Sequence, residues 1–185
     1  MGNLDVMRYL NLKGSVLESI IRHLKPSDNT DFCEIYGHAS VMEHTSQIQY
    51  LSTDKVASLF DSPESYTLVA EHDSKVVGHV SLFLSSKARA KHCASLAIAV
   101  NPKFHGKGIG KTLMEAAIDQ ADNWLNLTRL ELEVNEDNVV AISLYKRVGF
   151  DVEGIKRLST FKSGSYINSV IMSRINPTYQ LGANK

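Results

Sequence analysis

Hydrophobic and polar residues alternate along the chain with two different periods, which predicts a mixed order of strands and helices. Short runs rich in β-branched and aromatic residues predict strands at 20–24, 66–71, 76–84, 95–100, 129–134, 150–155, 158–161 and 166–175. The polar turn 72–75 indicates an antiparallel hairpin, and Ser163-Gly164 indicates another. The run 95–100 is apolar on both faces, as expected of a central strand.

Apolar residues spaced by three or four positions predict helices between these strands. The longest is expected to run from the glycine-rich stretch 105–112 to about Leu125. Four residues would form its buried stripe: Leu113, Ala117, Ala121 and Trp124. Another helix is expected after Asn138 as N-cap, ended by Gly149-Phe150, and two short ones after Asp28 and Thr53. The strand–helix–strand order around the longest helix predicts one crossover within an α/β (α+β) domain.

Length and composition indicate one globular domain. The chain has 185 residues, of which 43% are hydrophobic and 22% charged. Residues 1–18 are weakly patterned and are expected to form an N-terminal appendage or lead-in helix. Residues 19–176 are expected to form a single domain, followed by a C-terminal tail at 177–185, because no linker or repeat divides them.

Charge and cysteine content exclude several classes of partner. The formal net charge is zero, so nothing predicts a nucleic-acid partner. No apolar run reaches the ~18 residues of a transmembrane helix, so no membrane partner is expected either. Two isolated cysteines, Cys33 and Cys93, provide neither a metal-ligand spacing nor a disulfide framework. We therefore expect a cytoplasmic protein without a metal; its oligomeric state is open, a homodimer included.

The stretch 105–112, HGKGIGKT, suggests a phosphate-binding loop but fails two familiar patterns. A P-loop needs a first glycine where this chain has His105. A dinucleotide-binding fingerprint needs its third glycine one residue later than Gly110. What remains is a helix N-terminus whose unpaired amide groups face one point, where a pyrophosphate fits. Glycine at 106, 108 and 110 would allow close approach, and Lys107 and Lys111 would add positive charge.

Two segments carry a resemblance to a known family. Val100–Gly110 resembles motif A of the GNAT superfamily of acetyl-CoA-dependent N-acyltransferases, Gln/Arg-x-x-Gly-x-Gly/Ala after a central strand. Asn138–Phe150 resembles the second signature of that family, Asn-x-x-Ala-x-x-Leu-Tyr-x-x-x-Gly-Phe. The resemblance covers roughly residues 20–175 and is nearest to bacterial members that acetylate amino acids or related small amines. The chain departs from the pattern at His105, usually Gln or Arg, and at Ser95, where close relatives often carry an acidic residue.

The resemblance implies a mostly antiparallel sheet, flanked by helices, with a V-shaped split between the strand that ends near Val100 and the strand that starts near Arg129. Acetyl-CoA would enter this split as co-substrate. Its pantetheine arm would pair with the backbone, and its pyrophosphate would lie on the glycine-rich loop. The implied cofactor-binding residues are Ile98, Ala99, Val100, His105, Gly106, Lys107, Gly108, Ile109, Gly110, Lys111, Asn138, Ala141 and Tyr145.

The resemblance also implies the chemistry, acetyl transfer to a primary amine through a tetrahedral intermediate. Tyr145 is the expected acid that protonates the departing thiolate. The base stays open, because an isolated histidine or carboxylate is more often structural than catalytic. The candidates are His79, His92, Glu71 and Glu133, or water held by backbone carbonyls.

The acceptor is expected to be a small-molecule amine, such as an amino acid, bound between residues 32–47 and the last hairpin near Tyr166. Glu34, Glu43 and His44 are unranked candidates for holding it. Three alternatives remain: a protein N-terminal acetyltransferase of the ribosomal-protein type, a non-catalytic acyl-CoA-binding regulator and, last, a P-loop nucleoside triphosphatase.

Overall fold

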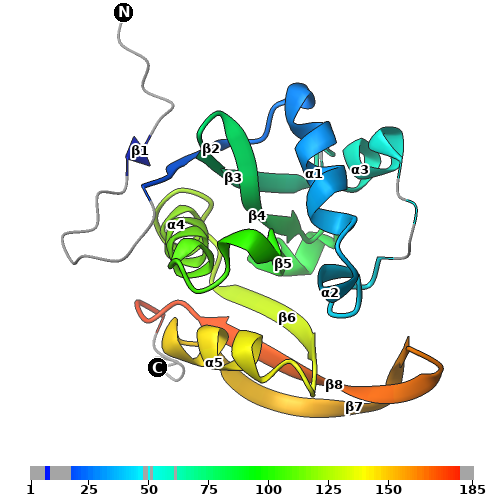
Figure 1. Ribbon diagram of the computed structural model, residues 1–185. Coiled ribbons are helices and arrows are strands. Elements are labelled where there is room, and N and C mark those ends of the chain that lie inside the picture. Colours follow the sequence, from blue (N-terminus) through cyan, green and yellow to red (C-terminus); the bar gives the residue numbers. More distant parts are fainter. Residues whose placement is uncertain (1–6, 9–17, 48–49, 51, 61, 180–185) are drawn as a thin grey trace, which may run out of the picture.

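The strands form one sheet that runs through the whole domain. The computed structural model describes residues 7–8, 18–47, 50, 52–60 and 62–179, and within them the sheet has eight strands in the order β1-β2-β3-β4-β5-β6-β8-β7 (Figure 1). The strands are β1 Met7–Arg8, β2 Ile20–His23, β3 Ser65–His72, β4 Lys75–Leu84, β5 Cys93–Val100, β6 Arg129–Asn135, β7 Asp151–Lys162 and β8 Ser165–Ile175. All neighbouring strands are antiparallel except β5 and β6, which are parallel and are connected through a helix.

Helices cover both faces of the sheet and enclose two apolar clusters. The α-helices are α1 Asn29–Tyr36, α2 Ala39–Met42, α3 Thr53–Phe60, α4 Ile109–Asn123 and α5 Val139–Arg147. Short 3₁₀ helices lie at Pro26–Asp28, Ala88–Ala90 and Pro102–Phe104. Residues of α1 and α3 pack on one face against β3 and β4. Residues of α4 and α5 pack on the other face, where the larger cluster continues onto β6 and β8.

The parallel pair β5 and β6 separates after three residue pairs. The pairing joins Cys93 to Arg129, Ala94 to Leu130 and Ser95 to Glu131, and then ends. Residues 96–100 and 132–135 therefore diverge, and Figure 1 shows β6 leaving β5 to form a second block with β8 and β7. The predicted V-shaped split is confirmed, and it lies where the sequence analysis placed it.

Most predicted elements are present with shifts of one or two residues at their ends. The hairpin of β3 and β4 turns at Asp73 and Ser74, as expected. Asn138 caps α5, because its Oδ1 accepts a hydrogen bond from the amide of Ala141 at 3.2 Å. Gly149 ends that helix with a φ of +94°, a conformation that strongly favours glycine.

Two details of the helical prediction were wrong. Trp124 does not belong to the buried stripe of α4; the helix ends at Asn123, and Trp124 is 72% exposed. Thr53 does not cap α3, because Ser52 Oγ accepts the amide of Lys55 at 3.2 Å. The appendage or lead-in helix expected within 1–18 lies almost wholly outside the described residues; of this segment, Met7–Arg8 pair with β2 as a strand.

The strands predicted at 150–155 and 158–161 are one continuous strand, β7. Where the break was expected, the pairing with β8 has a register irregularity between Lys156 and Thr160. A second irregularity lies between Val152 and Gly154. Leu158 there has a φ of +51°, and its amide donates to Asn168 Oδ1 at 3.0 Å instead of to a ladder carbonyl. A side chain thus replaces one backbone hydrogen bond, which keeps the hairpin intact through the bulge.

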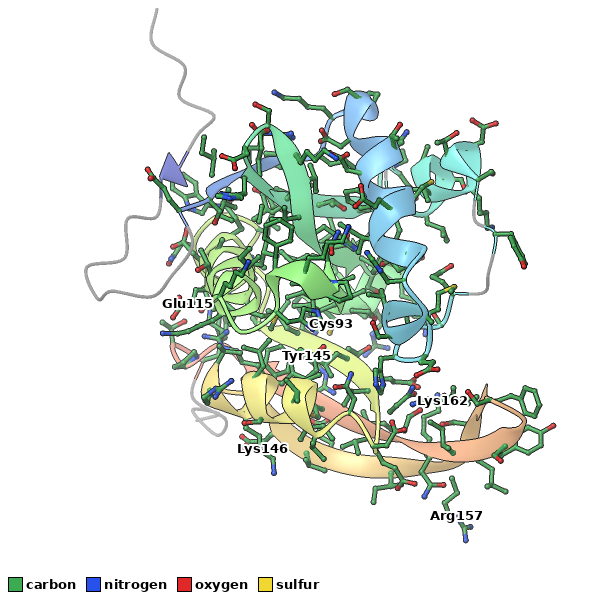
Figure 2. The ribbon with its side chains drawn as sticks, in the orientation of Figure 1. Cys93, Glu115, Tyr145, Lys146, Arg157 and Lys162 are labelled. Atoms are coloured by element: carbon green, nitrogen blue, oxygen red, sulfur yellow. The ribbon has the colours of Figure 1, made fainter. Side chains whose placement is uncertain are left out.

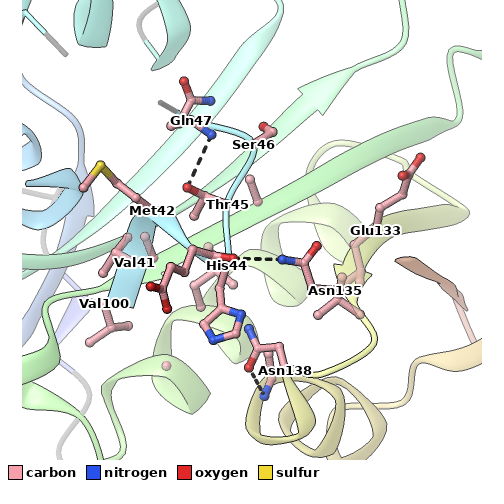
Figure 3. A pocket seen from close by; sticks show the side chains of 18 of the residues that line it. Val41, Met42, His44, Thr45, Ser46, Gln47, Val100, Glu133, Asn135 and Asn138 are labelled. Carbon is pink, nitrogen blue, oxygen red and sulfur yellow. Dashed lines mark hydrogen bonds between the residues drawn. The ribbon is translucent and has the colours of Figure 1, made fainter. Parts of the chain in front are cut away.

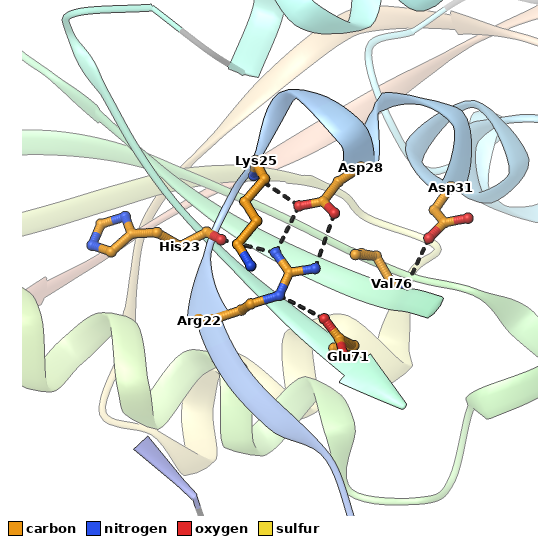
Figure 4. A network of polar contacts seen from close by, with 7 residues as sticks. All are labelled: Arg22, His23, Lys25, Asp28, Asp31, Glu71 and Val76. Carbon is orange, nitrogen blue, oxygen red and sulfur yellow. Dashed lines mark hydrogen bonds and ion pairs between the residues drawn. The ribbon is translucent and has the colours of Figure 1, made fainter. Parts of the chain in front are cut away.

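Asp28 occupies the N-cap position of α1, but its side chain does not cap the helix. Its carboxylate accepts two hydrogen bonds from Arg22, at 2.7 and 2.9 Å, and one from the amide of Lys25 at 2.8 Å (Figure 4). Arg22 also donates to Glu71 at 2.6 Å. The network joins β2 and β3 to the start of α1, so the residue predicted as a cap instead connects three elements.

Candidate functional site

The split between β5 and β6 opens into a cavity of about 2050 Å³. The ends of β5 and β6, the start of α4 and one side of α5 line it from the core. The segment 39–47 and residues 159–163, at the end of β7 and the start of the turn after it, line it from the outside. Segments far apart in the sequence therefore meet around one opening, which is large enough for an extended ligand and a second, smaller one.

The glycine-rich loop enters α4 through two left-handed glycines. Gly106 has a φ of +73° and Gly108, the N-cap of α4, a φ of +83°. The first amide to bond back into the turn is that of Thr112, which donates to Gly108. Within the described residues, the amides of 106–111 have no hydrogen-bond partner. Such unpaired amides at a helix N-terminus carry a partial positive charge and fit the pyrophosphate of a nucleotide coenzyme.

His105, the departure from the motif, fastens this loop to the end of β5. Its Nε2 lies 2.8 Å from the carbonyl oxygen of Val100. Since a carbonyl can only accept, Nε2 carries the hydrogen. His105 is exposed and lines the cavity, and its ring holds the first turn of the loop by a hydrogen bond within the chain.

Lys107 and Lys111 were expected to add positive charge to the phosphate site, and Gly110 was expected to allow close approach of the ligand. Lys111 lines the cavity and pairs with Glu115 at 3.4 Å. Lys107 does not line the cavity; its Nζ lies 4.8 Å from the ring centre of Phe104. A Cβ at Gly110 would lie 3.4 Å from Leu144 Cδ2, an ordinary contact, so this position is defined by packing of α4 against α5.

The register of β5 decides which of its peptide groups face the split. Asn101 donates its amide to Val77, and Cys93 accepts the amide of Ser85, so both point toward β4. Backbone groups of alternate residues in a strand point to opposite neighbours. The peptide groups of Ile98 and Val100 therefore face the open edge, while those of Ala99 face β4. Ala99 still lines the cavity, but only Ile98 and Val100 have peptide groups that could pair with the pantetheine arm as expected.

Asn138, Ala141 and Tyr145 lie on the side of α5 that faces the cavity. Figure 2 shows Tyr145 on the face of α5 that points toward the domain, and Lys146 on the opposite face. Tyr145 is only 7% exposed, and its hydroxyl has no hydrogen bond to another described residue. The hydroxyl oxygen itself is nevertheless not fully buried. The hydroxyl is therefore accessible from the cavity and free to bond a ligand.

Burial raises the pKa of Tyr145 to about 12. The phenol therefore stays protonated at neutral pH and can donate a hydrogen bond to a developing anion. Because a thiol has an ordinary pKa of about 8.5, proton transfer from a phenol near 12 to a thiolate is uphill, and a second proton that restores the phenol would favour it.

Three of the four side chains considered as the base lie away from the cavity. His79 is fully buried behind its wall, and burial lowers the pKa of His79 to about 3. His92 lies at the closed end of the split, where its carbonyl accepts the amide of Arg129. Glu71 pairs with Arg22 and does not line the cavity. Glu133 does line the cavity, but it pairs with Lys156 at 2.7 Å.

The acceptor side only partly matches the prediction. Residues 39–47 line the cavity as expected, Glu43 and His44 among them, whereas Glu34 lies outside and is within 4 Å of Lys75 and Lys103. The last hairpin contributes residues 159–163 and not Tyr166. Sequence reasoning missed Lys162, which belongs to no motif, and Arg147, which stands at a variable position of the second signature; only the fold brings them to the opening.

Comparison with known proteins agrees with this geometry. The model of the acetyltransferase (GNAT) family matches residues 29–150. The chain belongs to the GNAT family. An L-amino acid N-acetyltransferase, AaaT, of Escherichia coli K12 is 33% identical over 159 residues, which cover 85% of this chain and 98% of that protein. Spermidine N(1)-acetyltransferase of the same strain is 28% identical over 156 residues, with coverages of 80% and 83%.

Solved structures show the same fold. A GNAT acetyltransferase from Streptococcus pneumoniae superposes with a TM-score of 0.75 at 26% identity, over 85% of this chain and 99% of that one. Spermidine N-acetyltransferase from Vibrio cholerae, solved with CoA and spermine, also gives 0.75 at 26% identity, with coverages of 84% and 94%. This GNAT protein is an acetyl-CoA-dependent N-acetyltransferase. Among its described residues, no helix has the length and apolarity needed to cross a membrane.

Proposed function

We propose that this enzyme transfers the acetyl group of acetyl-CoA to the primary amine of a small molecule, with an amino acid as the first candidate. One observation supports this most directly: the unpaired amides before α4, the open edge of β5 and the hydroxyl of Tyr145 all border one cavity. The relatives named above act on amino acids or spermidine, and the one named for amino acids is the more similar in sequence.

In this proposal, the pyrophosphate of acetyl-CoA accepts hydrogen bonds from the amides of the loop 106–111. The pantetheine arm pairs with Ile98 and Val100, as a short added strand. A peptide N–H of the same edge donates to the thioester oxygen and stabilises the negative charge that develops there. This places the thioester in the split, beside α5.

The neutral amine then attacks the thioester carbon, and the C–N bond forms. On collapse, the C–S bond breaks and the sulfur takes the proton of Tyr145. The nitrogen of the intermediate loses a proton and restores the phenol, which the raised pKa of Tyr145 favours. Over the reaction, an ammonium and acetyl-CoA become an amide, CoA thiol and one proton.

Charged side chains of both signs line the cavity in which the acceptor would bind. Glu43, Glu131 and Glu133 line it together with Arg147 and Lys162. A carboxylate-bearing amino acid and a polycation thus both find opposite charges, so the charge pattern does not choose between them. The segments 39–47 and 159–163 bring Glu43 and Lys162 to the outer side of the cavity, where the acceptor would enter, whereas Glu131 and Glu133 come from β6 and Arg147 from α5.

The test is release of CoA thiol from acetyl-CoA, measured against a panel of amines. The panel should contain amino acids, spermidine, and a peptide with a free N-terminal alanine. Turnover with amino acids and little with the peptide is expected. Preference for the peptide would support the protein-acetylating alternative. Binding of acetyl-CoA in calorimetry without thiol release for any amine would support the non-catalytic regulator.

A further inference from the structure

His44 lines the cavity on its outer side. It follows α2 and lies next to Asn138 at the start of α5 (Figure 3). The preceding residue, Glu43, accepts a hydrogen bond on its carbonyl from Asn135 Nδ2 at 3.0 Å. His44 Nδ1 lies 3.8 Å from Asp137 Oδ1. Two contacts thus hold this segment to the loop between β6 and α5, across the split.

The two nitrogens of the ring have different surroundings. Nδ1 is buried and has no hydrogen-bond partner within the described residues. Nε2 is not among the buried unpaired atoms, and no described residue bonds it. Because His44 lines the cavity with about a third of its side chain exposed, Nε2 remains accessible there. The ring therefore directs one nitrogen to Asp137 and leaves the other for a ligand.

Asp137 is fixed in an orientation that suits this role. Its Oδ2 accepts from Lys162 Nζ at 2.6 Å, which leaves Oδ1 toward His44. The hydrogen bond from Lys162 is the main cause that lowers the pKa of Asp137, with a smaller contribution from His44. The carboxylate is therefore ionised at neutral pH and favours the hydrogen of His44 on Nδ1. Nε2 then carries the lone pair. Glu43, adjacent in the chain, brings a further negative charge to the same side of the cavity.

Most other proton acceptors of the cavity are already engaged: Glu131 pairs with Arg129, and His105 donates its Nε2 to Val100. Glu43 also lines the cavity, next to His44 in the chain. Ser95 carries a hydroxyl at the last paired position of β5, Glu133 is held by Lys156, and His79 lies behind the wall. The acceptor amine must lose a proton before it can attack, since alkylammonium groups have pKa values near 10. A base at the outer side of the cavity meets that need.

We propose that His44 is the catalytic base of this enzyme and that Asp137 is its positioning residue. Nε2 of His44 takes one proton from the acceptor ammonium, directly or through one water, and yields the neutral amine. The imidazolium is stabilised by Asp137 and returns its proton to solvent after the product leaves. This inference rests on the proposed acetyl transfer and adds the group that accepts the net proton.

The experiment compares wild type with His44→Ala, His44→Gln and Asp137→Asn on the best amine of the panel. Loss of the base should lower kcat/KM for the amine by about 100-fold or more, while the affinity for acetyl-CoA changes less than threefold. Imidazole and substituted imidazoles should restore activity to His44→Ala, with rates that rise with the basicity of the added compound. They should not rescue Asp137→Asn, which keeps its ring.

Two matched controls come from the same segments. His38→Gln changes a histidine at the start of α2 that also has a buried unpaired nitrogen but does not line the cavity. Glu136→Gln changes the carboxylate next to Asp137, which bonds Asn168 instead. Both should keep wild-type kcat/KM. A purely structural role for His44 would give no rescue that depends on basicity.

Wild-type activity retained by His44→Ala, or a loss without rescue by any imidazole, would overturn the assignment of the base. These outcomes differ from failure of the proposed function itself, in which wild type releases no thiol with any amine. The folded state of each variant is checked by its thermal unfolding midpoint, and His44→Gln serves as the more conservative replacement.

Discussion

The hydroxyl of Tyr36 lies 2.9 Å from Nε2 of His79, in the apolar layer between α1 and β4. The direction of this hydrogen bond follows from a chain behind it. Thr67 donates its single hydroxyl hydrogen to the carbonyl of Phe60, so it must accept from Ser81 at 2.9 Å. Ser81 then accepts from Nδ1 of His79 at 3.3 Å. Nε2 is left as an acceptor, and Tyr36 donates to it.

This arrangement makes the neutral form of His79 part of the folded state. The ring stacks on Phe32 with centroids 4.5 Å apart and is closed off from solvent. Burial lowers the pKa of His79 to about 3. An unfolded histidine has a pKa near 6.5, so between pH 6.5 and 3 the unfolded chain binds more protons than the folded one. Stability contributed by neutral His79 is present above pH 6.5 and is lost as the pH falls.

We therefore predict that His79→Gln flattens the pH dependence of stability. Wild type should lose about 1.6 kcal/mol more than the variant between pH 6.5 and 5.0, from 1.36 kcal/mol per pKa unit and an unfolded histidine that is half protonated at pH 6.5. Urea unfolding at several pH values in this range measures the difference. Shifted carboxylates such as Glu153, with a pKa of about 2, act only below pH 4.5 and do not interfere. Parallel curves for both proteins would contradict the assignment.

The pattern of the sequence predicted the sheet well because its signals are local. Alternation and hairpin turns defined β3, β4 and β6, and the caps of α5 were correct because Asn138 and Gly149 act on their own turns. The errors came from tertiary contacts. The carboxylate of Asp28 bonds Arg22 instead of capping, and Leu158 bonds Asn168 across the bulge of β7.

The site was predicted only as far as its motifs reach. Twelve of the thirteen residues implied by the resemblance line the cavity, and Lys107 does not. The peptide groups of Ile98 face the open edge of β5 and those of Ala99 face β4. This difference follows from hydrogen bonds at both ends of β5, which the periodicity of the sequence cannot show. His44 and Asp137 come together only because α2 reaches across the split, so the sequence offered His44 merely as one unranked candidate.

Asp28→Asn should destabilise the fold without affecting catalysis. Burial raises the pKa of Asp28, but the hydrogen bonds from Arg22 and Lys25 outweigh it and lower the net value. The side chains of Asp28 and Arg22 are only 6% and 10% exposed, so neutralising Asp28 leaves the buried charge of Arg22 balanced by the carboxylate of Glu71 alone. We expect a loss of about 3 kcal/mol in unfolding free energy at pH 7. Chemical denaturation measures it.

The control for this network is Glu71→Gln, which should cost less, because Glu71 is 25% exposed and only its own contact to Arg22 changes. kcat/KM per folded molecule should stay at the wild-type value in both variants, since neither residue lines the cavity. Equal destabilisation by the two substitutions would mean that Arg22 does not depend mainly on Asp28.

Gly106→Ala should weaken binding of acetyl-CoA while the domain stays folded. The added Cβ meets no atom within 4 Å, but the φ of +73° is costly for alanine, by about 1–2 kcal/mol. The loop would relax from the conformation that directs its amides to one point, and affinity measured by calorimetry should fall about tenfold. Gly154→Ala is the matched control, with equal free space and no left-handed φ, and should bind as wild type does.

Tyr145→Phe removes one oxygen from the cavity and tests the proposed acid. No described residue bonds the hydroxyl, so stability and the affinity for acetyl-CoA should hardly change. We expect kcat to fall by about 100-fold or more, because the departing thiolate loses its proton donor. Tyr166→Phe, on the exposed last hairpin and outside the cavity, should keep full activity. If Tyr145→Phe turned over at the wild-type rate, the sulfur would have to take its proton from solvent, and Tyr145 would be a packing residue of α5.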